Sequence, residues 1–338
     1  MRNAALLVRA LADPSAIIGL DAADWTALVA IARAESLIGS LAWRLEALAV
    51  PDAVAAILAD ARRSAAQAQT QALWEGEMAR RALAPLGIPV VLLKGTAYAA
   101  AGLEAARGRT IGDLDILVPR GALDQVEGAL LAAGWEWVKE DPYDDLYYRR
   151  WMHELPPLIH RARDRMIDVH HTILPPTARP TPDPAALIAG SVALPTGLRI
   201  LSPADMIVHS AAHLFADGDL AGGLRNLWDI DRLLRGFAAA PGFWSALADR
   251  AAHHQLQPAV ARALRLARAI YATPVDADVA GPPRMADALY RRRLLARDGW
   301  GRERDKALRF AFYVRSHWLR MPPAMLARHL WTKARKSR

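Results

Sequence analysis

The sequence predicts an α+β fold, in which a mixed sheet is flanked by helical regions that come before and after it in the chain. Three observations predict this class. Short apolar runs separated by turn residues are confined to the middle of the chain, the first 85 residues are rich in Ala and Leu with few breakers, and helical spacing of apolar residues returns after residue 200. We expect an N-terminal helical bundle (1–85), a catalytic core built on the sheet (86–200) and a C-terminal helical region with a basic tail (201–338).

The N-terminal unit is predicted to hold about four helices, because apolar residues recur near helical spacing in it. Three of these helices cover residues 22–34, 36–49 and 52–82. Asp21 is suited to cap the first of the three, and Pro51 suits the start of the last. We interpret this unit as a scaffold that packs against the core.

Residues 89–119, PVVLLKGTAYAAAGLEAARGRTIGDLDILVP, are the segment around which the core is expected to form. An apolar strand is followed by a tight turn and an Ala-rich helix, and a second strand then carries Asp113 and Asp115. Because strand side chains alternate between the two faces, these two carboxylates project the same way. Adjacent carboxylates repel each other, and a divalent metal ion relieves that repulsion.

A third acidic residue, Asp168, lies in a similar apolar context, MIDVH at residues 166–170. If this strand lies beside the one that carries Asp113 and Asp115, three carboxylates meet at one edge of the sheet and can hold two Mg²⁺ ions. A solvated strand end with unrelated acids is the alternative, but unpaired buried charge is expensive. His170 lies on the same strand face as Asp168. It could orient the Asp168 carboxylate or contact the substrate that accepts the transferred group. A histidine that is merely hydrogen-bonded is the third alternative.

The turn after the first strand is predicted to bind phosphate. Gly95 lets the backbone approach a phosphate, and Thr96 heads a helix whose free N–H groups favour an anion. Lys94 would join them in binding the β- and γ-phosphates of a nucleotide, or else its side chain would point to solvent. Arg109, with Arg107 as its substitute, could make a bidentate phosphate contact, and two surface arginines in a loop are the alternative.

The remaining strands of the sheet are predicted from shorter sequence patterns. We expect a helix over 121–133, ended by Gly134, and a strand over 135–139. An antiparallel pair of strands is expected over 147–160 and 165–173. Five prolines between residues 175 and 184 predict a loop or linker.

Helices are predicted through the C-terminal region, at about 202–215, 222–236, 243–254, 257–271, 284–297, 305–318 and 323–336. His209 and His213 lie four residues apart on the first of these, and with Asp217, Asp229 and Asp231 they could form a metal site. The helix is otherwise apolar and lacks the glutamate of the zinc-protease signature. We therefore favour histidines that line the acceptor cleft or lie in the core.

Composition narrows the function classes. The chain has no cysteine, which excludes disulfides, thiolate metal sites and cysteine nucleophiles and is compatible with a cytoplasmic location. No apolar run approaches the roughly 18 residues of a membrane span, so we expect no transmembrane segment.

Residues 284–338 hold 13 Arg and 3 Lys against 4 acidic residues, a net charge of +12, while the remainder carries −4. Either this is a solvated helix face or it guides an anionic acceptor, and long nucleic acid is disfavoured because no recognised binding module accompanies the charge.

The blocks Leu93-Lys94-Gly95, Arg109, Asp113-Leu114-Asp115-Ile116-Leu117-Val118 and Ile167-Asp168-Val169-His170 resemble the nucleotidyltransferase fold shared with DNA polymerase beta. They are most similar to its branch of uncharacterised nucleotidyltransferases, over roughly residues 86–235. Two features depart from the wider pattern. Gly95-Thr96 stands where Gly-Ser is common, and the sixteen residues 97–112 make a longer spacing before the first acid.

The resemblance implies a metal-dependent nucleotidyltransferase that moves a nucleoside monophosphate from a nucleoside triphosphate, ATP by default, to a hydroxyl or phosphate of a small molecule or peptide. Asp113 and Asp115 would ligate both Mg²⁺ ions, and Asp168 the one that binds the acceptor hydroxyl. Two alternatives remain open. The same two-metal site could use a nucleotide sugar and act as a glycosyltransferase, for example on a phosphorylated peptide, or the fold could be a non-catalytic nucleotide-binding adaptor.

Overall fold

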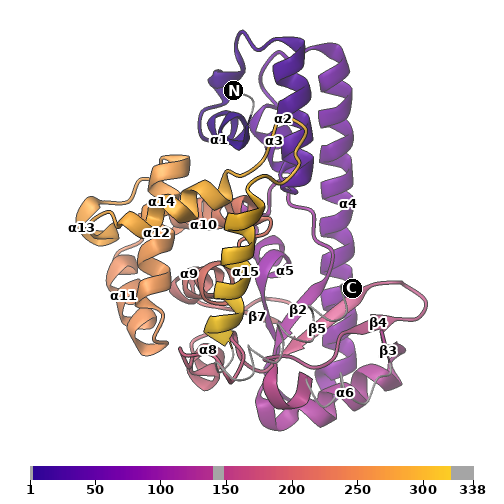
Figure 1. The fold of residues 1–338 in the computed structure, drawn as a ribbon. Helices are drawn as coiled ribbons and strands as arrows, with labels where there is room; N and C mark the ends of the chain where they lie inside the picture. Colours follow the sequence, from indigo (N-terminus) through magenta and orange to yellow (C-terminus); the bar gives the residue numbers. More distant parts are fainter. Residues whose placement is uncertain (1–2, 140–147, 321–338) are drawn as a thin grey trace, which may run out of the picture.

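A seven-stranded mixed sheet occupies the middle of the chain, and helices precede and follow it (Figure 1). The computed structural model describes residues 3–139 and 148–320. The strand order is β3-β4-β5-β2-β1-β7-β6. The predicted α+β class, with helical regions flanking a mixed sheet, is confirmed. The division into three units at residues 85 and 200 stays a prediction.

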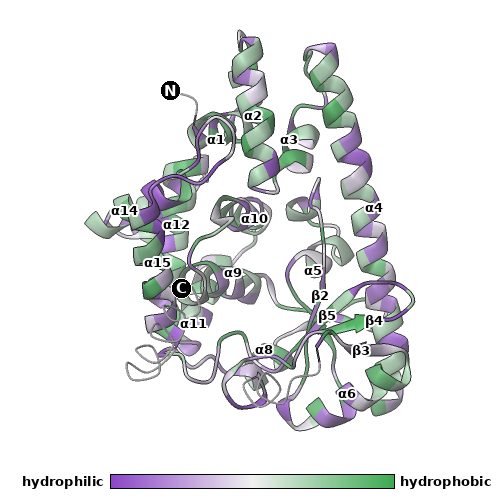
Figure 2. Ribbon diagram, turned by 45° about the vertical axis from the view of Figure 1, so that its right-hand side comes forward, coloured by the Kyte–Doolittle hydropathy of each residue, from purple (hydrophilic) through white to green (hydrophobic). Residues whose placement is uncertain are grey.

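The N-terminal segment forms the four predicted helices, α1 (Ala4–Ala12), α2 (Ala22–Ala34), α3 (Ile38–Arg44) and α4 (Asp52–Leu83). Asp21 caps α2 as predicted, because its carboxylate accepts a hydrogen bond of 2.7 Å from the backbone N–H of Asp24. The 32-residue α4 runs from beside α2 and α3 to the sheet, where it contacts α5, α6 and β2 (Figure 1). Hydrophilic and hydrophobic residues alternate along it in Figure 2, as expected of a helix with one buried face.

The strands are short, and the central pair carries the acids. Their bounds are β1 Val91–Leu92, β2 Leu114–Leu117, β3 Trp135–Trp137, β4 Leu158–His160, β5 Met166–His170, β6 Val192–Ala193 and β7 Arg199–Ile200. β2 pairs in parallel with β5 and antiparallel with β1, and all four residues of β2 are buried. Between them lie α5 (Lys94–Ala100), a 3₁₀ turn (Glu104–Ala106) and α6 (Leu123–Ala132). Gly134, at φ 99°, follows α6 as predicted.

One prediction about the strands was wrong, and one hairpin was missed. The strand expected over 147–160 is only three residues long, and residues 148–151 are helical, while residue 147 lies outside the described part of the chain. Arg149 in this helical turn donates to the Glu127 carboxylate of α6 at 2.8 Å, so a tertiary ion pair overrides the strand preference of the aromatic residues around it. The hairpin of β6 and β7 was not predicted, although β7 pairs in parallel with β1 and extends the sheet.

The C-terminal region is helical, as predicted. Its elements are α8 Pro184–Ala189, α9 Pro203–Ala211, a π-helical turn Ala212–Asp217, α10 Gly223–Phe237, α11 Phe243–His253, α12 Gln257–Tyr271, α13 Ala277–Ala280, α14 Met285–Leu294 and α15 Lys306–Arg320. The helix expected over 323–336 lies outside the described residues. Over residues 3–139 and 148–320, no helix combines the length and the apolar character that crossing a membrane requires.

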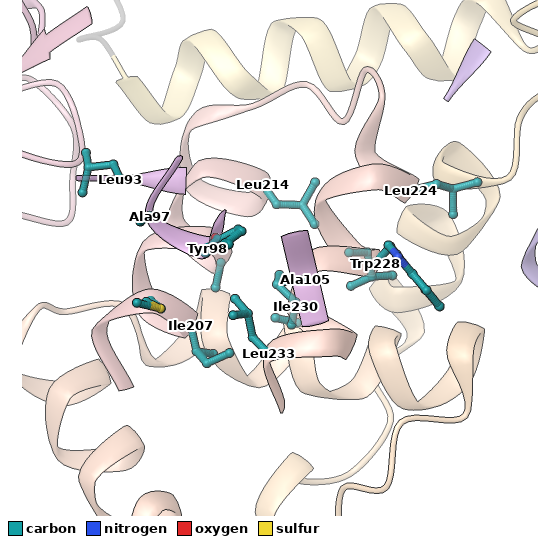
Figure 3. Packing of buried hydrophobic residues seen from close by; sticks show 14 of the residues in the cluster. Leu93, Ala97, Tyr98, Ala105, Ile207, Leu214, Leu224, Trp228, Ile230 and Leu233 are labelled. Carbon is teal, nitrogen blue, oxygen red and sulfur yellow. The ribbon is translucent and has the colours of Figure 1, made fainter. Parts of the chain in front are cut away.

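One hydrophobic core joins the helix after β1 to the C-terminal helices. Ala97 and Tyr98 of α5 belong to the same buried cluster as Ile207 of α9 and Leu233 of α10 (Figure 3). The hydroxyls of Tyr98 and Ser210 are 2.9 Å apart, which adds a polar contact between α5 and α9. The start of α5, next to the acids, is therefore covered by α9 and α10.

Candidate functional site

The three predicted acids lie together at one edge of the central strands. Asp115 on β2 is directly opposite Asp168 on β5, and Asp113 immediately precedes β2. One carboxylate oxygen from each residue lies within 4.8 Å of the other two. Asp113 is exposed, Asp168 is partly buried and Asp115 is buried. Hard divalent cations such as Mg²⁺ prefer this kind of oxygen donor set.

The electrostatics of the acids favour a bound cation. Burial, reinforced by the charges of Asp115 and Glu154, raises the pKa of Asp168 to about 7. Burial alone would also raise the pKa of Asp115, but the Lys94 ammonium and the His170 hydrogen bond outweigh it and lower that pKa far below its usual value. Three carboxylates that repel one another at this distance fit a divalent ion, which would remove the repulsion.

Lys94 makes an ion pair with the most buried of these acids. Its Nζ donates to Oδ1 of Asp115 at 2.6 Å, so the side chain does not point away to solvent. Lys94 also borders a cavity of about 20 Å³, which has room for water rather than for a nucleotide. The other lining residues are Tyr98, Arg109, His209, Ser210, His213, Asn226 and Asp229.

Gly95 makes room for an arginine in this structure. A Cβ at position 95 would stand 1.9 Å from Nη1 of Arg109, so only glycine allows the guanidinium to lie there. Arg109 donates from Nε to Asp229 at 3.1 Å, and Arg225 pairs with the other oxygen of that carboxylate. The predicted phosphate contacts of Gly95 and Arg109 stay predictions, and the structure adds a packing role to both.

Thr96 lies in the core rather than at the acids. Its side chain is 1% exposed, and its methyl group would be 3.8 Å from a Cβ added at Gly76 of α4. Among the described residues Oγ1 finds no hydrogen-bond partner. The structure therefore does not bring this hydroxyl to the carboxylates. Arg107, the predicted substitute for Arg109, stacks on the ring of Trp43 at 5.1 Å.

His170 contacts a different carboxylate from the one that its position on the strand suggests. Its Nε2 lies 2.9 Å from Oδ1 of Asp115, whereas the sequence pairs it with Asp168. Burial would lower the pKa of His170, but the hydrogen bond and charge of Asp115 outweigh it and raise that pKa. His170 thus helps to fix the orientation of Asp115.

Two residues near the acids were missed by sequence reasoning. Oε2 of Glu154 lies 3.4 Å from Nδ1 of His170, and the rings of His153 and His170 stack with centroids 5.2 Å apart. The available signal was the His-Glu pair inside a segment predicted to pair with residues 165–173. It was overlooked because that segment carries no regular alternation.

The second set of candidate ligands is largely engaged in other contacts, as far as the described residues show. His209 and His213 line the cavity beside Lys94, and burial lowers the pKa of His209 well below its usual value. Asp229 is paired with arginines, and Asp231 accepts hydrogen bonds from Arg232, Arg235 and Thr273. The side chain of Asp217 is outside the described part of the structure. No metal-ligand cluster in the described residues includes either histidine.

Some of the basic residues that the structure describes in the tail pair with acids. Arg297 pairs with Glu35 of the N-terminal region at 2.6 Å, and Glu303 accepts from Arg293 and Arg309. This favours packed helices with a charged outer face over a free cationic surface. A role of the remaining positive charge in guiding an anionic acceptor stays a prediction.

None of the curated proteins compared with the chain matches it. A family model described as uncharacterised nucleotidyltransferase matches residues 21–272. The match reaches further than the motif blocks at 86–235, since it includes most of the N-terminal helices and extends to the end of α12. It covers well over half of the 338 residues, so the chain belongs to this uncharacterised nucleotidyltransferase family.

Proposed function

We propose that the protein is a Mg²⁺-dependent nucleotidyltransferase that transfers a nucleoside monophosphate from a nucleoside triphosphate to a hydroxyl or phosphate of a small molecule or peptide. The observation that carries the proposal is the register of β2 and β5, which sets Asp168 opposite Asp115 with Asp113 in reach of both. ATP as donor and a cytoplasmic location are parts of the same proposal.

The three carboxylates supply the ligands for the metal. Two Mg²⁺ ions on Asp113, Asp115 and Asp168 would neutralise the phosphate charge and lower the pKa of the attacking hydroxyl. Asp168 accepts the proton of the acceptor group. The acceptor oxygen forms a bond to the α-phosphorus as the bond from that phosphorus to the bridging oxygen breaks, and pyrophosphate leaves with the electron pair.

The groups around the acids hold and orient the reactants. Lys94 and Arg109 provide positive charge on the side of the β- and γ-phosphates, next to the backbone of Gly95 and Thr96. Lys94 is paired with Asp115 in the structure, and its ammonium would be available to phosphate if a cation were bound at that carboxylate. His170 holds Asp115 in position through its hydrogen bond.

Nucleotide binding with and without Mg²⁺ tests the proposal directly. Each of the four common nucleoside triphosphates, labelled at the α-phosphate, is mixed with the full chain, and binding and release of pyrophosphate are measured. Asp113→Asn should weaken Mg²⁺-dependent binding by more than about 100-fold, because it removes a ligand rather than an outer partner. Asp113 is exposed, so this variant should keep its fold.

Asp164→Asn is the matched control, since this exposed carboxylate lies in the turn before β5. It should bind as the wild type does. Absence of binding and turnover with every triphosphate, or equal binding by the Asp113→Asn variant, would contradict the proposal. An acceptor that gains the mass of a hexose from a nucleotide sugar would replace it with glycosyl transfer.

A further inference from the structure

We propose that His153, Glu154 and His170 form a second metal site, separate from the three acids, that binds one divalent transition-metal ion of the zinc type. One ligand atom from each of these residues lies within 4.8 Å of the other two. The described residues hold only this group and the acid triad as clusters of this kind. Two imidazoles and one carboxylate form the donor set of many zinc sites, in which the fourth position is left to water or substrate.

The distances between the ligand atoms are close to those of a tetrahedral zinc site. Oε2 of Glu154 lies 3.4 Å from Nδ1 of His170 and 3.8 Å from Nε2 of His153. Metal-ligand bonds of about 2.0–2.1 Å at a tetrahedral angle place neighbouring ligand atoms about 3.4 Å apart.

The backbone holds the three residues together before any ion binds. Glu154, which precedes β4, forms an isolated antiparallel bridge with His170. The N–H of Leu155 donates to the carbonyl of Val169 at 2.9 Å, and the N–H of His171 donates to the carbonyl of His153 at 2.9 Å. The ligands therefore come from two paired backbone segments, which makes the site pre-formed rather than dependent on a mobile loop.

The imidazole of His153 has one of its two nitrogens buried and unpaired among the described residues. Its Nδ1 is buried and makes no hydrogen bond to any residue that the structure describes. Its Nε2 stands 3.8 Å from Glu154, which is beyond hydrogen-bond distance. A metal ion on Nε2 would hold the ring in this position, while Nδ1 would stay without a partner among these residues.

His170 carries the outer partner that is typical of a metal-binding histidine. Its Nε2 bonds to Asp115 at 2.9 Å, which leaves Nδ1 directed toward Glu154. A ligating histidine commonly donates its other ring N–H to a carboxylate, and this fixes the tautomer and the ring orientation. Through His170 the second site would be linked to Asp115, the central acid of the first.

The two sites differ in the ions they select. The acid triad offers oxygen alone, which suits Mg²⁺, whereas imidazole nitrogen suits Zn²⁺ and its neighbours. Glu154 also lines a cavity of about 250 Å³ with Arg120, Arg149 and His171. The chain has no cysteine, so tight zinc binding must use histidine and carboxylate.

Zinc binding by the untagged full chain tests the proposal. Protein stripped with EDTA is titrated with Zn²⁺ against a chromophoric chelator, with millimolar Mg²⁺ present to occupy the acids. We expect one tight site per chain, weakened by at least about 100-fold in His153→Asn and in Glu154→Gln, which each lose a ligand. Asp115→Asn should weaken it by about 10–100-fold through His170. Asp113→Asn should leave it unchanged.

His253→Asn is the control for adventitious zinc, because His253 is an exposed histidine paired with a carboxylate, that of Asp183, on the surface. Circular dichroism checks that each variant is folded. If His153→Asn does not fold, the zinc affinity of Glu154→Gln, in which the new side chain has nearly the same shape, decides the test. Co²⁺ in place of Zn²⁺ should give visible absorption bands, and these bands should change in the His153→Asn and Glu154→Gln variants. Wild-type affinity in both folded variants, no tight site in the wild type, or a site lost in Asp113→Asn would overturn the proposal.

Discussion

Replacing Asp168 by Asn should stabilise the metal-free protein, even though it removes a residue of the proposed active site. The carboxylate of Asp168 lies among Asp115, Glu154 and Asp113, and burial with these charges raises its pKa from 3.8 to about 7. An amide of the same shape carries no charge to be repelled. The destabilising effect of the ionised carboxylate should therefore disappear in Asp168→Asn.

The size of the effect follows from the pKa. A rise from 3.8 to about 7 corresponds to an upper bound of about 4 kcal/mol at 1.36 kcal/mol for each pKa unit. The side chain is partly exposed, so solvent screening reduces this, and we expect a gain of about 2 kcal/mol in the free energy of unfolding.

The pH dependence has a definite sign. Below pH 4 the carboxyl is protonated in both the folded and the unfolded chain, so the substitution has no electrostatic effect. Between pH 4 and pH 7 the unfolded chain ionises while the folded one keeps its proton, and the wild type loses stability as the pH rises. The advantage of Asp168→Asn should grow over this range and stay constant above it.

Urea unfolding in EDTA, followed by tryptophan fluorescence at pH 4.5 and pH 8, measures this advantage. Asp164→Asn is the control and should unfold as the wild type does at both values. Added Mg²⁺ should reverse the order, because a ligand at 100 times its dissociation constant stabilises the protein that binds it by about 2.7 kcal/mol. A variant less stable than the wild type at pH 8 in EDTA, or an advantage that shrinks as the pH rises, would refute the reasoning.

The remaining predictions concern the packing around Arg109, with stability measured by the same urea unfolding. Gly95→Ala should lower the free energy of unfolding by about 1–2 kcal/mol, because overpacking against Arg109 exceeds the gain in helix propensity. Gly128→Ala on α6 meets no atom within 4 Å, so it should gain about 0.5–1 kcal/mol, and equal effects of the two would contradict the packing role of Gly95. Asp229→Ala leaves Arg109 and Arg225 buried without their carboxylate and should cost about 3–5 kcal/mol. A loss below 1 kcal/mol there would mean that water replaces the ion pairs.

The sequence signals that single out the three acids are local. Asp113 and Asp115 alternate with buried apolar residues, and so does Asp168, so each side chain could be assigned to a strand face from its immediate neighbours. The one non-local step, that β5 lies beside β2, was a condition of the prediction, and the structure shows this pairing. The helices of both flanking regions were predicted for the same reason, since their apolar spacing extends over several turns.

The contacts that were missed join residues far apart in the chain. Arg109 and Asp229 are 120 residues apart, and no local pattern indicates that this arginine pairs with a helix of the C-terminal region. β6 and β7 have two residues each, too few to show an alternation. The contact of Glu154 with His170 was not predicted, because residues 147–160 were assigned to one long strand and that assignment gave Glu154 no specific partner.

The length of α4 gives the molecule a mechanical property. Its 32 residues span about 48 Å, and Glu75 on its C-terminal half makes a two-bond ion pair with Arg163, in the turn that leads into β5. A rigid rod of this length, tilted by about 5° at one end, moves the other end by about 4 Å. α4, which packs against α3, is thus tied by this ion pair to the turn that precedes the strand bearing Asp168.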